Sequence, residues 1–112
     1  MMIELIIKEH LERELKVEVG FEMGFSQAGQ FVIVEKVGSS RTNYIDHSSF
    51  AIQSYADTMY KAAKLNYRVK AAMEKLIEDG NIASVVLDSD YNFTDTTTKK
   101  YRYQAVYDIT HY

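Results

Sequence analysis

The chain has 112 residues, of which 46% are hydrophobic and 26% charged, and it contains no Pro, Cys or Trp. This length fits one domain, because single hydrophobic cores are common at roughly 100–150 residues. The lack of cysteine excludes disulfides, a cysteine-bearing zinc site and a thiol nucleophile. The formal charge of −3 argues against a general nucleic-acid binder, which would normally be basic.

Hydrophobic runs in this chain are short, and residues 31–34 form one of the longest. Such a run cannot span a bilayer, so we expect no membrane partner. The first residues include Glu4, Lys8 and Glu9, which does not match a secretory signal. We therefore expect residues 1–112 to form a single soluble, intracellular domain.

The first third of the chain predicts a helix followed by two strands. Residues 2–15 form an amphipathic pattern with an apolar residue at every fourth position: Ile3, Ile7, Leu11 and Leu15. His10 borders this stripe, which favours a partly buried structural role. Alternation predicts a strand over residues 17–22, and after a glycine-containing loop at 24–30 a second strand covers residues 31–37.

The middle of the chain predicts a turn, a strand and a long helix. Residues 38–43 have the composition of a polar turn, and residues 44–54 read as a strand whose first half is exposed. Residues 54–57 resemble a capping box, which would open a helix that runs to Asp79 and stops at Gly80. The apolar stripe of this helix comprises Met59, Ala62, Leu65, Val69, Ala72, Met73, Leu76 and Ile77.

The last third predicts two strands joined by a loop. Residues 82–87 form the first strand, and residues 88–98 form a loop rich in Asp and Thr. Residues 101–112 alternate clearly, with Tyr101, Tyr103, Ala105, Tyr107 and Ile109 on one face. The element order α-β-β-β-α-β-β with short loops predicts an α+β fold of two layers. In it, two helices cover a mainly antiparallel sheet of four or five strands.

Two segments contain residue types that serve in metal sites or catalysis. Residues 88–92 begin like a calcium loop, but Phe93 replaces the glycine and Lys99 the bidentate glutamate that such a loop needs. Residues 46–49 combine Asp, His and Ser, yet neighbours on a strand point to opposite faces and do not form a triad by themselves. We expect no metal, no cofactor and no enzymatic activity.

Charge and tyrosine are unevenly distributed along the chain. The long helix carries a basic stripe beside its apolar face: Lys61, Lys64, Arg68 and Lys75. This stripe is either a solvated face or a surface for an acidic partner, another subunit or DNA. Because the first helix is rich in glutamate, an acidic and a basic helix could pair head-to-tail between copies, which closes into a ring when the rotation permits. Tyrosine suits both half-covered sheets and interfaces.

Two long segments resemble a small structural protein of long-tailed phages and prophages: residues 38–56 and 89–107. The closest functional class is the tail terminator, also called the tail-completion or head–tail joining protein and sometimes a minor capsid protein. This resemblance implies a small α+β domain that forms a hexameric ring on the tail tube, stops tube growth and meets the head connector. Its partners would then be copies of itself, the major tail tube protein and a neck protein, with DNA passing through the ring. It would act in the host cytoplasm during assembly and in the virion.

Polar loops and the basic stripe are the expected contact surfaces of such a ring subunit. The candidate interface residues are Arg41, Asn43, Tyr44, Asp46, Lys61, Lys64, Arg68, Asp90, Tyr91, Asn92, Asp95, Lys99 and Lys100. Another neck protein, such as a head-completion protein, is the nearest alternative. A small ligand- or peptide-binding module is an alternative from a different class.

Overall fold

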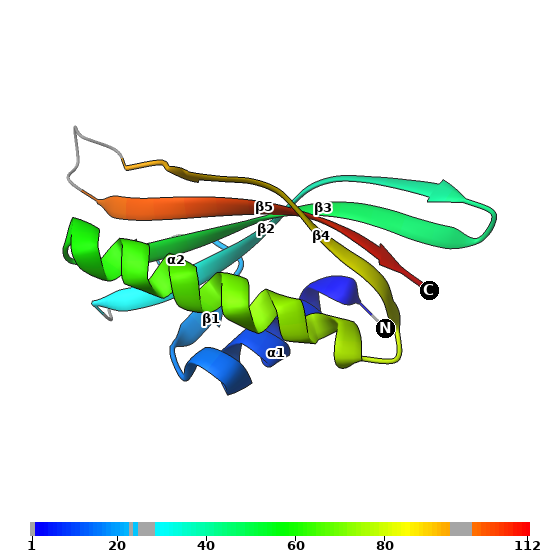
Figure 1. The fold of residues 1–112 in the computed structure, drawn as a ribbon, viewed down its shortest axis with the longest axis horizontal. Helices are drawn as coiled ribbons and strands as arrows, with labels where there is room; N and C mark the ends of the chain where they lie inside the picture. The colour runs from blue at the N-terminus through cyan, green and yellow to red at the C-terminus, as the bar shows by residue number, and fades with distance from the viewer. Residues whose placement is uncertain (1, 23, 25–28, 95–99) are drawn as a thin grey trace.

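The computed structural model describes residues 2–22, 24, 29–94 and 100–112 (Figure 1). The elements are α1 (Ile3–Leu15), β1 (Glu18–Gly20), β2 (Gln30–Thr42), β3 (Ile45–Ala56), α2 (Met59–Glu74), the 3₁₀ turn η1 (Lys75–Glu78), β4 (Ile82–Asn92) and β5 (Tyr101–His111). This order confirms the predicted α-β-β-β-α-β-β sequence and the α+β class. Neither helix in the described ranges is long and apolar enough to cross a membrane.

One open sheet of five strands forms the first layer, in the order β1-β2-β3-β5-β4. All neighbouring strands are antiparallel except β1 and β2, which pair in parallel. Both helices lie on the same side of this sheet and form the second layer (Figure 1). No helix among the described residues covers the other face of the sheet.

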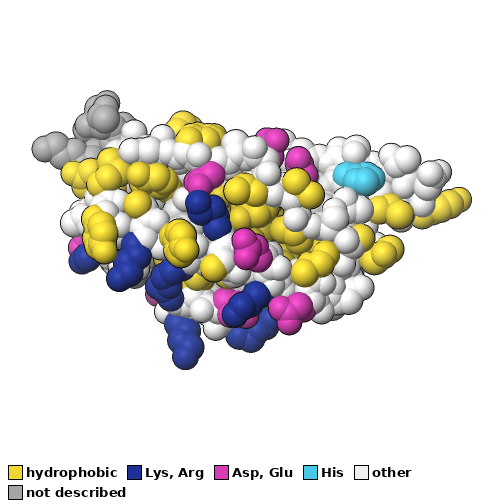
Figure 2. Space-filling model, viewed as in Figure 1, with side chains coloured by type: hydrophobic (Ala, Val, Ile, Leu, Met, Phe, Trp, Pro, Cys, Tyr) yellow, Lys and Arg dark blue, Asp and Glu magenta, His cyan; other side chains and the backbone are white. Residues whose placement is uncertain are grey.

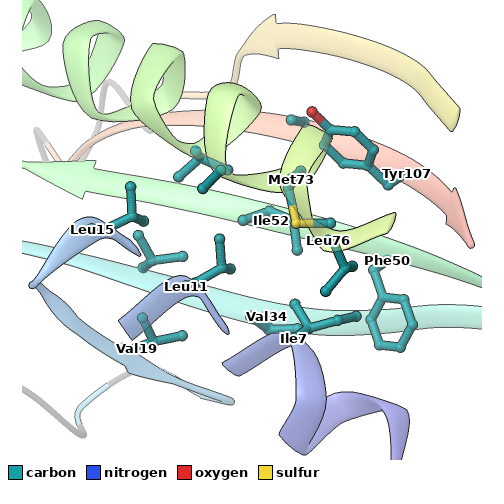
Figure 3. Packing of buried hydrophobic residues seen from close by; sticks show 14 of the residues in the cluster. Ile7, Leu11, Leu15, Val19, Val34, Phe50, Ile52, Met73, Leu76 and Tyr107 are labelled. Carbon is teal, nitrogen blue, oxygen red and sulfur yellow. The ribbon is translucent and has the colours of Figure 1, made fainter. Parts of the chain in front are cut away.

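The hydrophobic core lies between the helices and the sheet (Figure 3). Its largest fully buried side chains include Phe50, Ile7, Leu11, Ile52, Leu65, Met73 and Leu76. The predicted four-residue stripe of α1 is buried along its whole length, and His10 beside it is 7% exposed. The His10 Nε2 atom lies 2.7 Å from the carbonyl oxygen of Ala72, which confirms the structural role expected for this histidine.

The predicted polar turn over residues 38–43 is wrong. Strand β2 continues through this segment to Thr42, and the reversal takes only Asn43 and Tyr44, so that Thr42 pairs with Ile45. Pairing with β3 overrides the weak strand preference of glycine and serine, because a long antiparallel partner supplies backbone hydrogen bonds at alternate residue pairs. The result is a long hairpin, and we call its outer part, residues 38–47, the arm.

The predicted start of the second helix at Ser54 is also wrong. Ser54 and Tyr55 lie buried in β3, where they pair with residues of β5. Instead, Thr58 caps α2, since its hydroxyl oxygen accepts a hydrogen bond of 3.1 Å from the backbone N–H of Lys61. Helical structure ends at Glu78, just before the predicted stop at Gly80.

The predicted loop over residues 88–98 begins too early. Strand β4 extends to Asn92 and accommodates the polar run with a register shift between Leu87 and Ser89. Such a bulge lets one extra residue enter a strand without ending the pairing. Residues 95–98 lie outside the described part of the chain.

Candidate subunit interface

The arm brings together four of the predicted interface residues. Asn43 and Tyr44 form its tip, and Arg41 lies opposite Asp46 on the paired strand, with 3.5 Å between Nε and Oδ1. None of residues 38–47 is buried. Tyr44 is 87% exposed, the largest exposed fraction among the exposed large hydrophobic residues of the described chain.

The basic stripe divides into residues with different partners. Lys61 lies 3.5 Å from Asp57 one helical turn earlier, and Lys64 is exposed. Arg68 instead donates a hydrogen bond of 2.6 Å to the carbonyl oxygen of Leu15, the last residue of α1. The carboxyl end of a helix carries partial negative charge, so the Arg68 guanidinium stabilises α1 at this end.

The acidic and basic helices meet within one chain. Besides the Arg68 contact with α1, the Lys75 ammonium lies 3.8 Å from the Glu14 carboxylate. The first contact joins the last turn of α1 to α2, and the second joins it to η1 directly after α2. Part of the charge that was expected to join neighbouring subunits is therefore used to hold the two helices together.

Reversing the charge of Arg68 is expected to destabilise the monomer. Arg68→Glu removes the hydrogen bond to Leu15 and places a negative charge at the carboxyl end of α1, at a cost of about 1–2 kcal/mol in the free energy of unfolding. Lys64→Glu is the matched control on the same helix, with an expected change within about 0.5 kcal/mol. Urea denaturation followed by circular dichroism measures both. Equal stability of the two variants would show that the Arg68 contact with α1 does not stabilise the monomer.

Asp90 belongs to the body of the protein. It lies in β4, where its carboxylate accepts a hydrogen bond of 2.7 Å from the Asn66 amide and forms an ion pair with Lys70. Asn66 is 3% exposed, so this contact gives the buried amide nitrogen of its side chain a hydrogen-bond partner. The prediction that Asp90 lies in a polar loop is therefore wrong, because β4 extends through Asp90 and places its carboxylate beside α2.

The other predicted residues near the carboxyl end lie around the β4–β5 connection. Asn92 contacts Met59 at the start of α2, with 3.3 Å between Nδ2 and Sδ. Lys100 is exposed, and Asp95 and Lys99 lie outside the described residues. Strand register separates this region from the arm: Tyr101 pairs with Ala56 at one end of β3, and His111 pairs with Asp46 at the other. The predicted residues thus occupy two ends of the molecule and one helix face, not one site.

A stack of aromatic and arginine side chains covers part of the sheet face without helices. The rings of Phe31 and Tyr55 stack with centroids 4.8 Å apart. The Arg102 guanidinium carbon lies 4.2 Å from the Phe93 ring centroid, and its Nη1 donates a hydrogen bond of 2.7 Å to the Tyr55 hydroxyl. These contacts join β2, β3, β5 and the end of β4. Cross-strand partners depend on register, so sequence reasoning did not identify this stack.

Amide side chains continue the same face toward β2 and β4. Gln53 donates from Nε2 to Gln104 Oε1 at 3.0 Å and contacts Glu35 Oε2 at 3.3 Å. Gln104 in turn donates to the Tyr91 hydroxyl. Both glutamines are 8% exposed, so the network is a fixed part of the sheet. Tyr91, predicted as a loop contact, therefore has an internal partner.

The Asp-His-Ser segment of the arm distributes its side chains over both sheet faces. His47 Nδ1 lies 3.2 Å from Thr110 Oγ1, and Ser49 donates a hydrogen bond of 2.7 Å to Asp108. Ser48, between them, lies on the opposite face with its hydroxyl 3.1 Å from His111 Nε2. This geometry agrees with the alternation argument against a triad. Within the described ranges, no group of three His, Cys, Asp or Glu residues is placed to hold a metal ion.

A groove of about 480 Å³ lies between α2 and the strands β4 and β5. Its lining comprises Tyr67, Lys70, Ala71, Glu74, Val85, Leu87 and Tyr107. Figure 2 shows hydrophobic side chains gathered on this face, with basic and acidic groups between them. Burial raises the pKa of Tyr107 to about 12, and the negative charges of Asp90 and Glu74 add to this effect. The phenol therefore stays protonated under ordinary conditions.

The arm thus lies at one end of the sheet, and the groove lies beside α2. Comparison with models of known protein families finds none that matches this chain, and a search of curated proteins finds no match.

Proposed function

We propose that this protein is a non-enzymatic structural subunit of a phage or prophage tail, which caps the tail tube as a ring, stops elongation and joins the tail to the head. The observation that supports this most directly is the arm, ten residues without one buried side chain, carried on a small and well-packed domain. Strand β5 pairs with β3 as far as Asp46, so only the tip of the arm, residues 42–45, is two-stranded. An exposed strand end of this kind offers surface for contact with another molecule.

The distribution of surfaces supports assembly between unlike faces. The arm lies at one end of the sheet, whereas the α2 groove lies on the helix layer. Contacts between two different surfaces of identical chains are head-to-tail, and they close into a ring when the rotation between subunits allows it. A hexamer is the ring size that the resemblance to tail terminators implies. In the virion its neighbours would be the major tail tube protein and a head connector.

Electron microscopy of particles from a phage or prophage lacking this gene tests the proposal. We expect filled heads beside separate tails that are unjoined or overlong, because nothing caps the growing tube. Adding the purified protein to such tails should restore capping, and Tyr60→Ala, a change at an exposed side chain on α2, should restore it equally.

Two other outcomes would contradict this proposal in different ways. Tails of normal length beside emptied heads would place the protein on the head side of the neck, as a head-completion or connector protein. Infectious particles of normal form would overturn both structural functions.

A further inference from the structure

Tyr44 occupies a conformation that tyrosine rarely adopts. The tip of the arm has positive φ at both central residues, 51° at Asn43 and 67° at Tyr44. This is the type I′ hairpin turn, in which Asn is favoured first and Gly second because bulky side chains are strained at positive φ. The ring is also 87% exposed. Within the described chain nothing covers Tyr44, so neither folding nor turn geometry accounts for an aromatic side chain here.

The groove beside α2 has the size and lining to receive one aromatic side chain. Its volume of about 480 Å³ lies in the range of small-ligand pockets, roughly 300–1,000 Å³. Tyr67 on α2 is 73% exposed, and Leu87 on β4 is 44% exposed. Tyr107 is buried against the groove and retains its hydroxyl proton. An entering ring would cover apolar surface that is otherwise in water.

Charges on the arm and the groove are complementary. Lys70 in the groove forms an ion pair with Asp90 of the same chain, whereas Glu74, one turn further along α2, has no ion-pair partner among the residues that the structure describes. The arm carries Arg41 and Asp46 beside the tip, with the Arg41 side chain 65% exposed. The exposed Arg41 guanidinium can therefore face the Glu74 carboxylate of the groove. Such matching fixes orientation at an interface.

Pairing of sheet edges is a less suitable way to join copies. The pairing of β2 with β3 contains a register shift between Lys36 and Gly38, so β2 is irregular at this point. The edge strand β4 has shifts between Ile82 and Ser84 and between Leu87 and Ser89. Bulges and charged side chains are devices that prevent edge strands from pairing with another chain. Docking of a side chain from the arm into the groove therefore suits this protein better than pairing of sheet edges.

We infer that Tyr44 at the tip of the arm inserts into the groove between α2 and β4 of a second copy of this chain. The occupant is the same protein because its own arm supplies the aromatic ring and the complementary charge. The contact joins two different surfaces and so repeats around a ring. This inference rests on the proposed function for its place in the virion, but the contact itself can be tested without a phage.

The absence of cysteine makes site-specific crosslinking between copies direct. Purified full-length Thr42→Cys chain, which keeps Tyr44 and places the thiol at an exposed position beside the tip, is mixed with full-length Leu87→Cys chain. The mixture is treated with a short bismaleimide, both free in solution and after addition to capless tails. We expect a crosslinked dimer of the two different chains. The matched control replaces Leu87→Cys with Tyr60→Cys, which is exposed on α2 outside the groove lining, and we expect roughly tenfold less dimer.

Tyr44→Gly separates docking from folding. Glycine is favoured at the second position of a type I′ turn, so the monomer should unfold at equal or higher urea concentration. Without the ring, recruitment to the neighbouring copy should weaken by roughly tenfold or more. Assembly of Tyr44→Gly at the level of the unmodified chain would overturn the inference.

The outcomes distinguish this inference from the proposed function. Rings on tail ends without the Thr42–Leu87 crosslink would overturn the docking contact and retain the tail function. A specific crosslink from a protein whose gene deletion leaves normal particles would support the contact and overturn the tail function. A tail partner crosslinked to Thr42→Cys in place of the second copy would overturn the assignment of the occupant.

Discussion

Replacing Phe50 with alanine is expected to lower the free energy of unfolding by about 3–5 kcal/mol. The Phe50 side chain is fully buried, so its removal leaves a cavity in the hydrophobic core. Phe50 is fully buried on β3, where it pairs with Lys36 of β2 and Tyr107 of β5. It is also the first large core residue after the arm, and it lies in the hydrophobic cluster beside Leu76 (Figure 3). The change should therefore loosen the base of the arm as well as the core.

Urea denaturation at neutral pH measures the effect of Phe50→Ala. A domain of this size has a total stability of about 5–15 kcal/mol, so a large part of it would be lost. Tyr60→Ala removes an aromatic ring of similar size that is 74% exposed, and it should change stability by no more than about 0.5 kcal/mol. A loss below about 1 kcal/mol in Phe50→Ala would show that the described core does not depend on this ring.

Stability is expected to fall at alkaline pH through Tyr107. Burial, together with the charges of Asp90 and Glu74, raises the pKa of this phenol in the folded state to about 12, against about 10 in the unfolded chain. A raised pKa means that the folded state holds its proton more tightly. The resulting stability is fully present below pH 10 and is lost as pH rises from about 10 to about 12.

The size of this alkaline loss follows from the shift in pKa. It amounts to on the order of 2–3 kcal/mol for Tyr107. Tyr107→Phe should show a smaller fall in unfolding free energy between pH 9 and 12 than the unmodified chain, whereas Tyr60→Phe, at an exposed position, should fall as the unmodified chain does. Identical alkaline profiles for all three proteins would contradict a buried, protonated phenol beside the groove.

The sequence alone predicted the elements whose hydrophobic period is strong. The four-residue stripe of α1 and the alternation of β5 each identify both the element and its buried face, because these periods reflect the geometry of a single helix or strand. Chain order and the lack of long connections then led to the α+β class. These features depend on neighbouring residues in the chain, which a sequence shows directly.

Element ends were predicted less well where tertiary pairing decides them. Residues 38–42 look like a turn, yet they pair with β3 and lengthen the hairpin into the arm. Residues 88–92 look like a loop, yet they pair with β5 around a bulge. In both segments a long partner strand supplies hydrogen bonds that local preference does not foresee.

The surfaces of the protein were decided almost wholly by tertiary structure. Sequence indicated that Tyr44, Arg41 and the basic helix were candidates for contact, but it did not show that Arg68 holds α1 in place. Nor did it show that Leu87 and Tyr67 border one groove. The sequence shows the period of hydrophobic and charged residues, and this period determines which face of each element is buried between the two layers. Which side chains meet across strands and helices depends on register and packing, and these are set only when the whole chain folds.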